Sequence, residues 1–223
     1  MAAPHFEFHD EVVPVSQQRF YPGLGKRLVD LVLLGLMLPV VLPLVGTVLL
    51  LTALGGRQPL YSQLRVGRDG RLFRCWKVRT MIPDADAALS RILRDNPALA
   101  EEWRTAQKLV RDPRVTRFGA LLRRTSLDEL PQLWNVLNGT MSLVGPRPFT
   151  PEQQGLYRNG HIDADYYRLR PGITGLWQVS RRNRGSFAER ATYDSAYSTN
   201  MGIWTDLSIL ARTVTVVLRA TGV

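Results

Sequence analysis

The feature that most constrains this chain is an uncharged apolar run from Leu31 to Leu54. It reads LVLLGLMLPVVLPLVGTVLLLTAL. A helix of about 20 apolar residues is long enough to cross the hydrocarbon core of a bilayer. The run begins too late, and lacks the small-residue cleavage site, to be a signal peptide. The sequence therefore predicts a helix that enters a membrane, with membrane lipid as a partner.

Two features bear on how this run meets the bilayer. Pro39 and Pro43 each remove a backbone donor and crowd the preceding turn, so a sharp kink is expected there. Basic residues flank both ends, with Lys26 and Arg27 before the run and several arginines over residues 57–74 after it. Positive charge favours the cytoplasmic side. A helix–break–helix hairpin within one leaflet satisfies both flanks, and a plain spanning helix satisfies one. The residues alone leave both topologies open.

The chain divides into three parts around this run. Residues 1–25 are polar, contain prolines and have no clear period, so we expect a loose N-terminal arm. Residues 26–56 form the membrane segment, and Asp30 at its apolar boundary is placed to pair with Lys26 or Arg27. Residues 57–223 are long enough to bury a core of their own.

Periodicity in residues 57–223 predicts short strands among helices, that is, a mainly helical α+β domain. The turn Arg68-Asp69-Gly70 is expected to join strands around residues 65–68 and 72–78 into a hairpin. Helices are expected over three segments: 83–110, which Pro97 divides in two; 118–138, which Asn138-Gly139 ends; and 186–196. Gly145-Pro146-Arg147-Pro148 is expected to be a rigid loop, and residues 169–179 a loop followed by a short strand.

The C-terminal stretch TDLSILARTVTVVLRATGV carries an amphipathic pattern. Trp204 lies just before it, and Arg212 and Arg219 fall off its main apolar stripe. The stripe consists of Leu207, Ile209, Leu210, Val214, Val217 and Leu218. The pattern is typical of a helix that lies in the membrane interface. An ordinary core helix would have the same pattern, and that alternative stays open.

The charge and cysteine content narrow the chemistry. The formal net charge is +10, and nearly all of the 29 basic residues are arginine. Arginine binds phosphate with two parallel hydrogen bonds, so phosphate or anionic lipid is an expected partner, although nucleic acid gives the same signal. The single cysteine, Cys75, excludes an internal disulfide and fits a cytoplasm-facing location. The three histidines show no metal-ligand spacing.

Two adjacent acids, Asp128 and Glu129, stand alone in a basic stretch. They are the only acids between Pro113 and Pro151, a stretch that also holds Arg114, Arg117, Arg123, Arg124 and Arg147. Ser126 and Glu129 form a capping-box pattern, and Pro131 suits a first helical turn, so the acids are expected at a helix N-terminus. As caps alone they would stabilise the helix by about 1 kcal/mol.

The chemical alternative to capping is a reaction at phosphorus. The surrounding arginines are expected to keep both acids ionised, and an ionised aspartate can attack phosphorus to give an acyl phosphate. Because a carboxylate and a diphosphate repel each other, we expect Mg²⁺ to bridge Asp128 and the phosphate oxygens. Arg147 would stabilise charge on the transferring group.

Four blocks of sequence resemble, in order, the bacterial sugar transferases also called monotopic phosphoglycosyl transferases. The long block DPRVTRFGALLRRTSLDELPQLWNVLNGTMSLVGPRP is highly specific. The others are Lys26-Arg27 with Asp30 before the apolar run, Arg65-Val66-Gly67 with Lys77-Val78-Arg79-Thr80-Met81, and RPGITGLWQVSRRN. With the region of Asp206, whose role stays unassigned, they cover about residues 26–212.

The resemblance implies a re-entrant membrane helix broken at a Ser-Pro pair. The matching positions here are Leu42-Pro43, so the proline is kept and the serine is not. It implies that residues 57–223 are the catalytic domain, on the cytoplasmic face of the bacterial inner membrane. The chain resembles the minimal form of the family, without extra N-terminal spanning helices.

The resemblance also implies a reaction. A UDP-sugar would donate a sugar-1-phosphate to undecaprenyl phosphate and release UMP, with Mg²⁺ as cofactor, in the first membrane step of polysaccharide or glycan assembly. Asp128, with Glu129, would be the catalytic pair and Asp128 the nucleophile. Lys77, Arg79, Arg124 and Arg147 would contact phosphate or nucleotide.

Two other classes of function are weighed against this one. A membrane-anchored nucleic-acid binder would account for the charge, but acids at the centre of the basic stretch disfavour it, so no nucleic-acid partner is expected. A non-catalytic membrane scaffold would not require the acids and arginines together. The sequence is compatible with a homo-oligomer.

Overall fold

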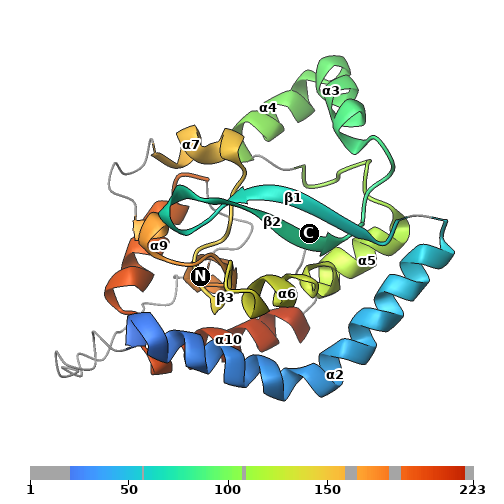
Figure 1. Cartoon of the computed structure of the whole chain (residues 1–223). Helices are drawn as coiled ribbons and strands as arrows, with labels where there is room; N and C mark the ends of the chain where they lie inside the picture. Colours follow the sequence, from blue (N-terminus) through green and yellow to red (C-terminus); the bar gives the residue numbers. More distant parts are fainter. Residues whose placement is uncertain (1–20, 57, 107–108, 159–164, 181–186, 219–223) are drawn as a thin grey trace.

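In the computed structural model, a strand hairpin and a smaller parallel strand pair are packed among helices (Figure 1). The structure describes residues 21–56, 58–106, 109–158, 165–180 and 187–218. The predicted N-terminal arm lies outside the described residues, except for a short π-helical segment, η1 (Tyr21–Gly25). The prediction of a mainly helical α+β chain with short strands and a long apolar N-terminal helix is confirmed.

The predicted hairpin is present. Strands β1 (Leu60–Val66) and β2 (Leu72–Val78) pair antiparallel, with Leu60 opposite Val78 and Val66 opposite Leu72. The turn between them, η2 (Arg68–Gly70), has Asp69 and Gly70 in the left-handed region, at φ 57° and 73°. Aspartate and glycine tolerate this conformation better than other residues, which is why the sequence signals the turn.

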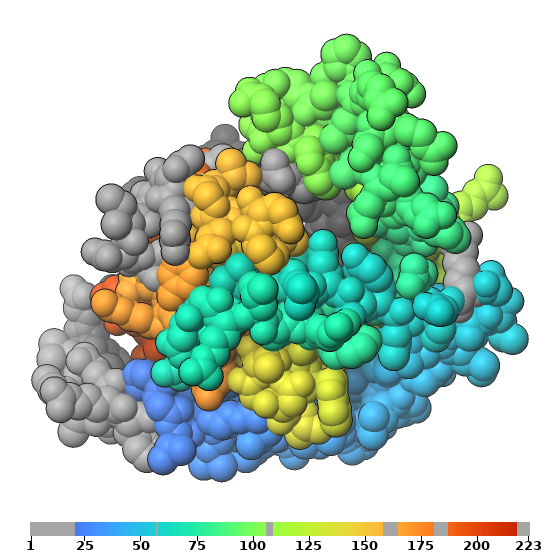
Figure 2. Space-filling view, turned by 45° about the horizontal axis from the view of Figure 1, so that its top comes forward, coloured from blue at the N-terminus to red at the C-terminus, as the bar shows by residue number. Residues whose placement is uncertain are grey.

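Helices α3 (Ala85–Asp95) and α4 (Pro97–Ala106) confirm the predicted division at Pro97. Asn96 caps the second helix, because its side-chain oxygen accepts from the amides of Ala98 and Leu99. In Figure 2 the two helices stand out from the rest of this face as a green lobe.

The helical segment predicted over residues 118–138 is present and ends at Asn138-Gly139, but it is divided into three pieces. The structure has α5 (Arg117–Thr125), a 3₁₀ turn η3 (Leu127–Glu129) and α6 (Gln132–Leu137). Ser126 separates them with a left-handed backbone at φ 59°, and its amide donates to the Arg123 carbonyl at the end of α5. The chain thus closes one helix and turns before it starts the next.

The parallel pair joins β3 (Ser142–Val144) to β4 (Gly172–Thr174). Residues 169–179 hold this strand followed by a helix, α8 (Leu176–Ser180), whereas a loop followed by a strand was predicted. Glycines allow a close backbone approach here: a Cβ on Gly145 would lie 2.4 Å from the Arg170 carbonyl oxygen. This packing holds the Gly145–Pro148 loop in place, as predicted.

Shorter elements complete the body. They are η4 (Pro151–Gln153), α7 (Gln154–Arg158), η5 (Asp165–Arg168), α9 (Arg190–Thr199) and α10 (Ile203–Leu218). Helix α9 corresponds to the helix predicted over residues 186–196. The apolar residues of α10 do not share one face, because Ile209 is buried while Trp204 and Val214 are exposed. Whether α10 lies in the membrane interface stays a prediction.

The apolar run forms one helix, α2 (Lys26–Leu54), which continues through Pro39 and Pro43. The predicted kink is present as a bend part-way along α2 (Figure 1), and the helical backbone is not interrupted there. Whether the segment is re-entrant or spanning stays a prediction. Both prolines are exposed. The hydrogen bonds that the prolines cannot make are therefore missing on the outer side of the helix. A helix bends away from its prolines, so α2 curves around the body.

One face of α2 packs on the body along its length. Leu34 and Val41 join the main hydrophobic core, and Val48 packs with Val78 of β2 and Leu122 of α5. Many apolar residues on the other face are exposed, including Leu36, Val40, Leu42, Leu50 and Leu54. Within the described residues, this is the one helix long and apolar enough to cross a membrane.

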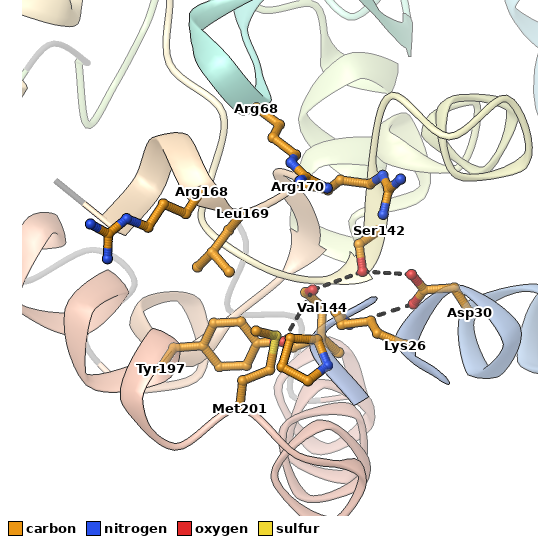
Figure 3. A pocket seen from close by; sticks show the side chains of 11 residues that line it. Lys26, Asp30, Arg68, Ser142, Val144, Arg168, Leu169, Arg170, Tyr197 and Met201 are labelled. Atoms are coloured by element: carbon orange, nitrogen blue, oxygen red, sulfur yellow. Dashed lines mark hydrogen bonds and ion pairs between the residues drawn. The ribbon is translucent and has the colours of Figure 1, made fainter. Parts of the chain in front are cut away.

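Buried polar contacts fasten the start of α2 to the body. Asp30 accepts from the Ser142 hydroxyl at 2.8 Å and the Leu143 amide at 3.1 Å, and lies 3.7 Å from the Lys26 ammonium (Figure 3). The predicted pairing of Asp30 with Lys26 is confirmed. Lys26 also pairs with Asp206 at 2.6 Å. Arg27 instead donates to the carbonyls of Val136 and Leu137, at the end of α6.

Candidate active site

The acid pair lies in η3, between α5 and α6. This differs from the predicted helix N-terminus: Ser126 does not cap the turn with its side chain, and α6 begins only at Gln132. Asp128 is 7% exposed and forms no hydrogen bond or ion pair within the described residues. A capping role therefore does not account for the pair.

Glu129 is held by two cations. The Lys77 ammonium donates to its Oε1 at 2.8 Å, and the Arg147 guanidinium donates to the same oxygen at 3.0 Å. Burial raises the pKa of Glu129, but Arg147 and Lys77 together bring it well below its usual range. Glu129 is therefore a permanently ionised group that fixes Lys77 and Arg147 beside Asp128.

Asp128 behaves differently from its neighbour. Burial raises the pKa of Asp128 to about 6, and the charge on Glu129 acts in the same direction. Lys77, Arg123 and Arg147 oppose this rise without cancelling it. The expectation that both acids are ionised at neutral pH agrees with both pKa shifts, but at Asp128 burial outweighs the cations. At neutral pH Asp128 is still mostly ionised, and its carboxylate has no partner that would need to be displaced.

The hairpin places Lys77 next to the acids, and Asn135 of α6 holds the hairpin there. The Asn135 side chain accepts from the Trp76 amide at 3.1 Å and donates to the Arg74 carbonyl at 2.8 Å, so it bonds the edge of β2 as another strand would. Asn135 is buried. Sequence reasoning missed this residue, although a polar residue inside the apolar LWNVL segment was an available signal.

Arg123 is the third cation near Asp128. Its Nε donates to the Thr80 hydroxyl at 2.9 Å, which ties α5 to the end of the hairpin. Gly119 allows this contact, because a Cβ there would lie 2.1 Å from the Thr80 carbonyl oxygen. Sequence reasoning counted Arg123 among the basic residues around the pair but gave it no role.

The Arg147 loop is anchored from β1. Arg65 donates to the Pro148 carbonyl at 3.3 Å, and the Val66 amide donates to the Phe149 carbonyl at 3.0 Å. Phe149 is fully buried in an aromatic cluster with Tyr157 and Tyr166. These contacts fix the backbone on either side of Arg147, so that its guanidinium can reach Glu129.

Two predicted phosphate contacts do not lie beside the acids. Arg79 donates to the Gln58 carbonyl at 3.1 Å and lies over the Tyr61 ring, on the β1 side of the hairpin. Arg124 is exposed on α5. Its neighbour Arg123, and not Arg124, is the α5 arginine whose charge acts on Asp128. Whether Arg79 or Arg124 meets substrate stays a prediction.

The acid pair is compatible with a magnesium ion. No cluster of three or more His, Cys, Asp or Glu side chains occurs within the described ranges. Mg²⁺, however, commonly binds one or two carboxylates together with water and substrate phosphate. Within the same ranges, no hydrogen bond uses either Asp128 carboxylate oxygen or Oε2 of Glu129. These oxygens are the ones that would hold the ion.

An unpartnered carboxylate among three cations, in a body wrapped by an exposed apolar helix, defines a class of protein: an enzyme of phosphate chemistry at a membrane. The comparison with known families is specific. The sequence profile of the family described as bacterial sugar transferase matches residues 21–220. The chain belongs to the bacterial sugar transferase family.

Individual relatives agree with this assignment. The chain is 45% identical over 198 residues to the UDP-galactose-lipid carrier transferase of Erwinia amylovora, a match that covers 88% of this chain and 41% of that protein. It is 43% identical over 198 residues to the undecaprenyl-phosphate galactose phosphotransferase of Salmonella typhimurium, covering 88% and 41%. It is 43% identical over 202 residues to the exopolysaccharide production protein ExoY of Sinorhizobium fredii, covering 90% and 88%. The chain thus spans less than half the length of the first two and most of the third.

Proposed function

We propose that this chain transfers a sugar-1-phosphate from a UDP-sugar to undecaprenyl phosphate, with release of UMP, as an early step of exopolysaccharide assembly. The name of the Erwinia relative supports the donor, that of the Salmonella relative the acceptor, and that of the Sinorhizobium relative the class of pathway. The observation that carries the chemistry is the difference between the two acids. Glu129 pairs with Lys77 and Arg147 through Oε1, whereas Asp128 is buried, ionisable and without a partner among the described residues.

Asp128 is the proposed nucleophile. A carboxylate oxygen of Asp128 attacks the β-phosphorus of the donor and forms an acyl phosphate that carries the sugar. The bond between the β-phosphorus and the bridging oxygen breaks, and that oxygen leaves as part of UMP. A phosphate oxygen of undecaprenyl phosphate then attacks the same phosphorus and displaces Asp128, which gives the lipid-linked diphosphosugar and restores the carboxylate.

Lys77, Arg123 and Arg147 are the cations that would stabilise charge on the phosphoryl oxygens. Glu129 is a positioning residue, because it fixes Lys77 and Arg147 through a single oxygen. When bound, Mg²⁺ would neutralise charge and let the carboxylate approach the diphosphate. Asp128 and Glu129 would hold the ion. Chelation with EDTA is therefore expected to abolish UMP release, and restored Mg²⁺ to recover it.

Covalent catalysis has a direct test. The protein in detergent, given a UDP-sugar and Mg²⁺ without acceptor, should gain the mass of one phospho-sugar and release UMP. Asp128→Asn should give neither. Asp69→Asn is the matched control: the same change at an exposed position in the hairpin turn, at the opposite end of β2 from Lys77, should react normally. An active protein that never carries the adduct would refute the covalent route, and a protein that releases no UMP from any UDP-sugar would favour a scaffold.

We also propose that α2 is re-entrant, with both ends on the cytoplasmic face. Its start is tied to α10 through Lys26 and Asp206, and its later part packs on Val78 and Leu122 through Val48. A spanning helix has its ends on opposite sides of the bilayer, where one folded body cannot contact both. The bend at Pro39 and Pro43 lets the helix return towards the body. The exposed apolar face would then meet lipid.

Cysteine labelling tests this topology. In a Cys75→Ser background, Leu24→Cys and Leu60→Cys should both resist a membrane-impermeant thiol reagent in intact cells and both react after the cytoplasmic side is opened. Labelling of only one of them in intact cells would identify a spanning helix.

A further inference from the structure

Arg190, at the start of α9, is clamped between two aromatic rings. Its guanidinium carbon lies 4.4 Å from the centroid of the Trp177 ring and 4.3 Å from that of Phe187. Such contacts orient a guanidinium strongly, because its flat faces are covered and only its edges stay available for hydrogen bonds. The clamp therefore presents the edge of Arg190 in a fixed direction.

Buried polar atoms without partners gather around this clamp. Within the described residues they are Arg190 Nε, Trp177 Nε1 and both amide atoms of Gln178. Trp177 and Gln178 are themselves more than nine-tenths buried. A buried donor without an acceptor costs free energy, and native proteins rarely leave several together. Three of these atoms are donors, and Trp177 and Arg190 are in contact, so these two N–H groups lack an acceptor that one ligand could supply.

The cluster lies against the Arg147 loop. A Cβ on Gly175 would lie 2.9 Å from Gln178 Oε1 and 2.1 Å from the Gly145 carbonyl oxygen, so Gln178 sits beside the start of that loop. On the other side of Arg147, the ring of Phe149 contacts the ring of Phe187, with centroids 6.2 Å apart. The clamp thus adjoins the residues that position Arg147.

The guanidiniums of Arg65, Arg147 and Arg190 act on one another here, and the acids Glu129 and Asp194 offset only part of this repulsion. Burial and the charge of Arg147 lower the pKa of Arg190 to about 9, and Arg65 adds to this effect. Burial lowers the pKa of Arg65 as well, and the charge of Arg147 lowers it further. Arg147 has an ion pair, with Glu129, whereas Arg65 donates to neutral oxygens and Arg190 forms no ion pair within the described ranges. Like charges held this close require an anion to compensate them.

We propose that Arg190, Trp177 and Gln178 form, with Arg65, the subsite for the nucleoside monophosphate that leaves the donor. The inference rests on the proposed function and extends it to residues that the reaction at Asp128 does not use. Phosphate oxygens supply the acceptors that Arg190 and the Trp177 indole N–H lack, and their charge balances the guanidiniums. Arg147 pairs with Glu129 at 3.0 Å, and its loop adjoins Gln178 at one end and Phe187 at the other, so it links the acid pair to this subsite. The phosphate that is not attacked therefore lies on the Arg190 side of Arg147.

UMP binding to the full-length protein in detergent tests the subsite without any turnover. Arg190→Gln should weaken UMP binding about ten- to a hundred-fold, the usual effect of losing a charge-assisted hydrogen bond, and should leave the weak binding of uridine unchanged. Arg168→Gln is the matched control, because Arg168 is an exposed arginine on η5, and it should bind UMP normally. Arg190→Lys should recover only part of the loss, since an ammonium keeps the charge but not the planar fork.

Trp177→Phe guards against a variant that fails to fold, because it keeps an aromatic ring beside Arg190 while it removes the indole N–H with the pyrrole ring. A several-fold loss of UMP affinity is expected from it. Wild-type UMP affinity in both Arg190→Gln and Trp177→Phe would overturn the subsite, even if the wild-type protein forms the phospho-sugar adduct. Failure of the proposed function is a separate result: the wild-type protein would then form no adduct, whatever the two variants bind.

Discussion

The ammonium of Lys26 donates to the carboxylate of Asp206 at 2.6 Å, across 180 positions of sequence. Both side chains are nearly buried, at 9% and 2% exposure. The hydroxyls of Tyr21 and Tyr197 also donate to Asp206, each at 2.7 Å. Asp206 is therefore the buried acceptor that joins the first turn of the membrane helix to α10, a role that the sequence left unassigned.

Replacement of Asp206 should destabilise the protein strongly. Asp206→Leu leaves Lys26 buried with only the more distant Asp30, and a loss of about 3 kcal/mol in the free energy of unfolding is expected from an uncompensated buried charge. The double variant with Lys26→Met should recover part of this loss. Glu101→Leu, which breaks an exposed pair with Arg104, should leave stability nearly unchanged. Urea unfolding in detergent measures all three, and wild-type stability in Asp206→Leu would contradict the anchor.

The two acids predict an unusual pH dependence of stability. Asp128 has a pKa of about 6 in the folded protein, against about 3.9 in an unfolded chain. Between these values the folded protein keeps a proton that the unfolded chain releases, so stability falls as pH rises from 4 to 6. Asp128→Asn removes this penalty and should stabilise the protein on the order of 2 kcal/mol at pH 8, and little at pH 4. Melting temperatures at both pH values, with Asp69→Asn as control, test this; an equal effect at both would contradict it.

Lys77 should matter for activity more than for folding. Lys77→Met keeps most of the side-chain stem but removes one of the two cations on Glu129. The pKa of Glu129 should therefore rise, and Glu129 should hold Arg147 less firmly. A fall of about 100-fold in the rate of UMP release is expected from the loss of one preorganised cation. Arg71→Met, at an exposed position of the hairpin, should keep full activity. Full activity in Lys77→Met would show that Lys77 is not part of the catalytic site.

Gly119 should not accept even a methyl group. In Gly119→Ala the new Cβ would lie 2.1 Å from the Thr80 carbonyl oxygen, so α5 must move and carry Arg123 away from Thr80. A destabilisation of about 2 kcal/mol is expected from such overpacking, together with lower activity. Gly155→Ala, in α7 with open space around its Cβ, is the control and should be neutral or slightly stabilising. Equal melting temperatures for the two variants would show that α5 can shift freely.

Local sequence signals predicted much of the fold. The Asp69-Gly70 turn, the division at Pro97 and the bend at Pro39 and Pro43 each depend on the backbone preferences of one or two residues, which act over a few positions. The capping pattern at Ser126 predicted a helix start there, but the separate 3₁₀ turn η3 before α6 could not be predicted in this way. A serine tolerates a helix as well as a turn, and packing of η3 against the hairpin decides which one forms.

Only part of the candidate site could be predicted from the sequence. The sequence showed two acids in a basic stretch and identified Lys77 and Arg147, both of which the structure places on Glu129. It could not separate the roles of the two acids. It also could not show that Arg123 lies near Asp128 and Arg124 does not, because adjacent residues on a helix point about 100° apart. Arg190 and Trp177 gave no signal of their own, and Asn135 gave only that of a polar residue in an apolar segment, since their importance comes from neighbours distant in sequence.

By itself, the sequence determined that this chain carries an apolar run, Leu31–Leu54, long enough to enter a membrane, and Asp128 and Glu129 among cations, because apolar length and charge order are properties of the chain alone. Only the tertiary structure decided that α2 stays one bent helix, that Glu129 pairs with Lys77 and Arg147 while Asp128 has no partner among the described residues, and that Arg190 lies over Trp177 and Phe187. The reason is physical: burial and pairing depend on which distant segments meet, and those two quantities set the pKa and the availability of each charged group.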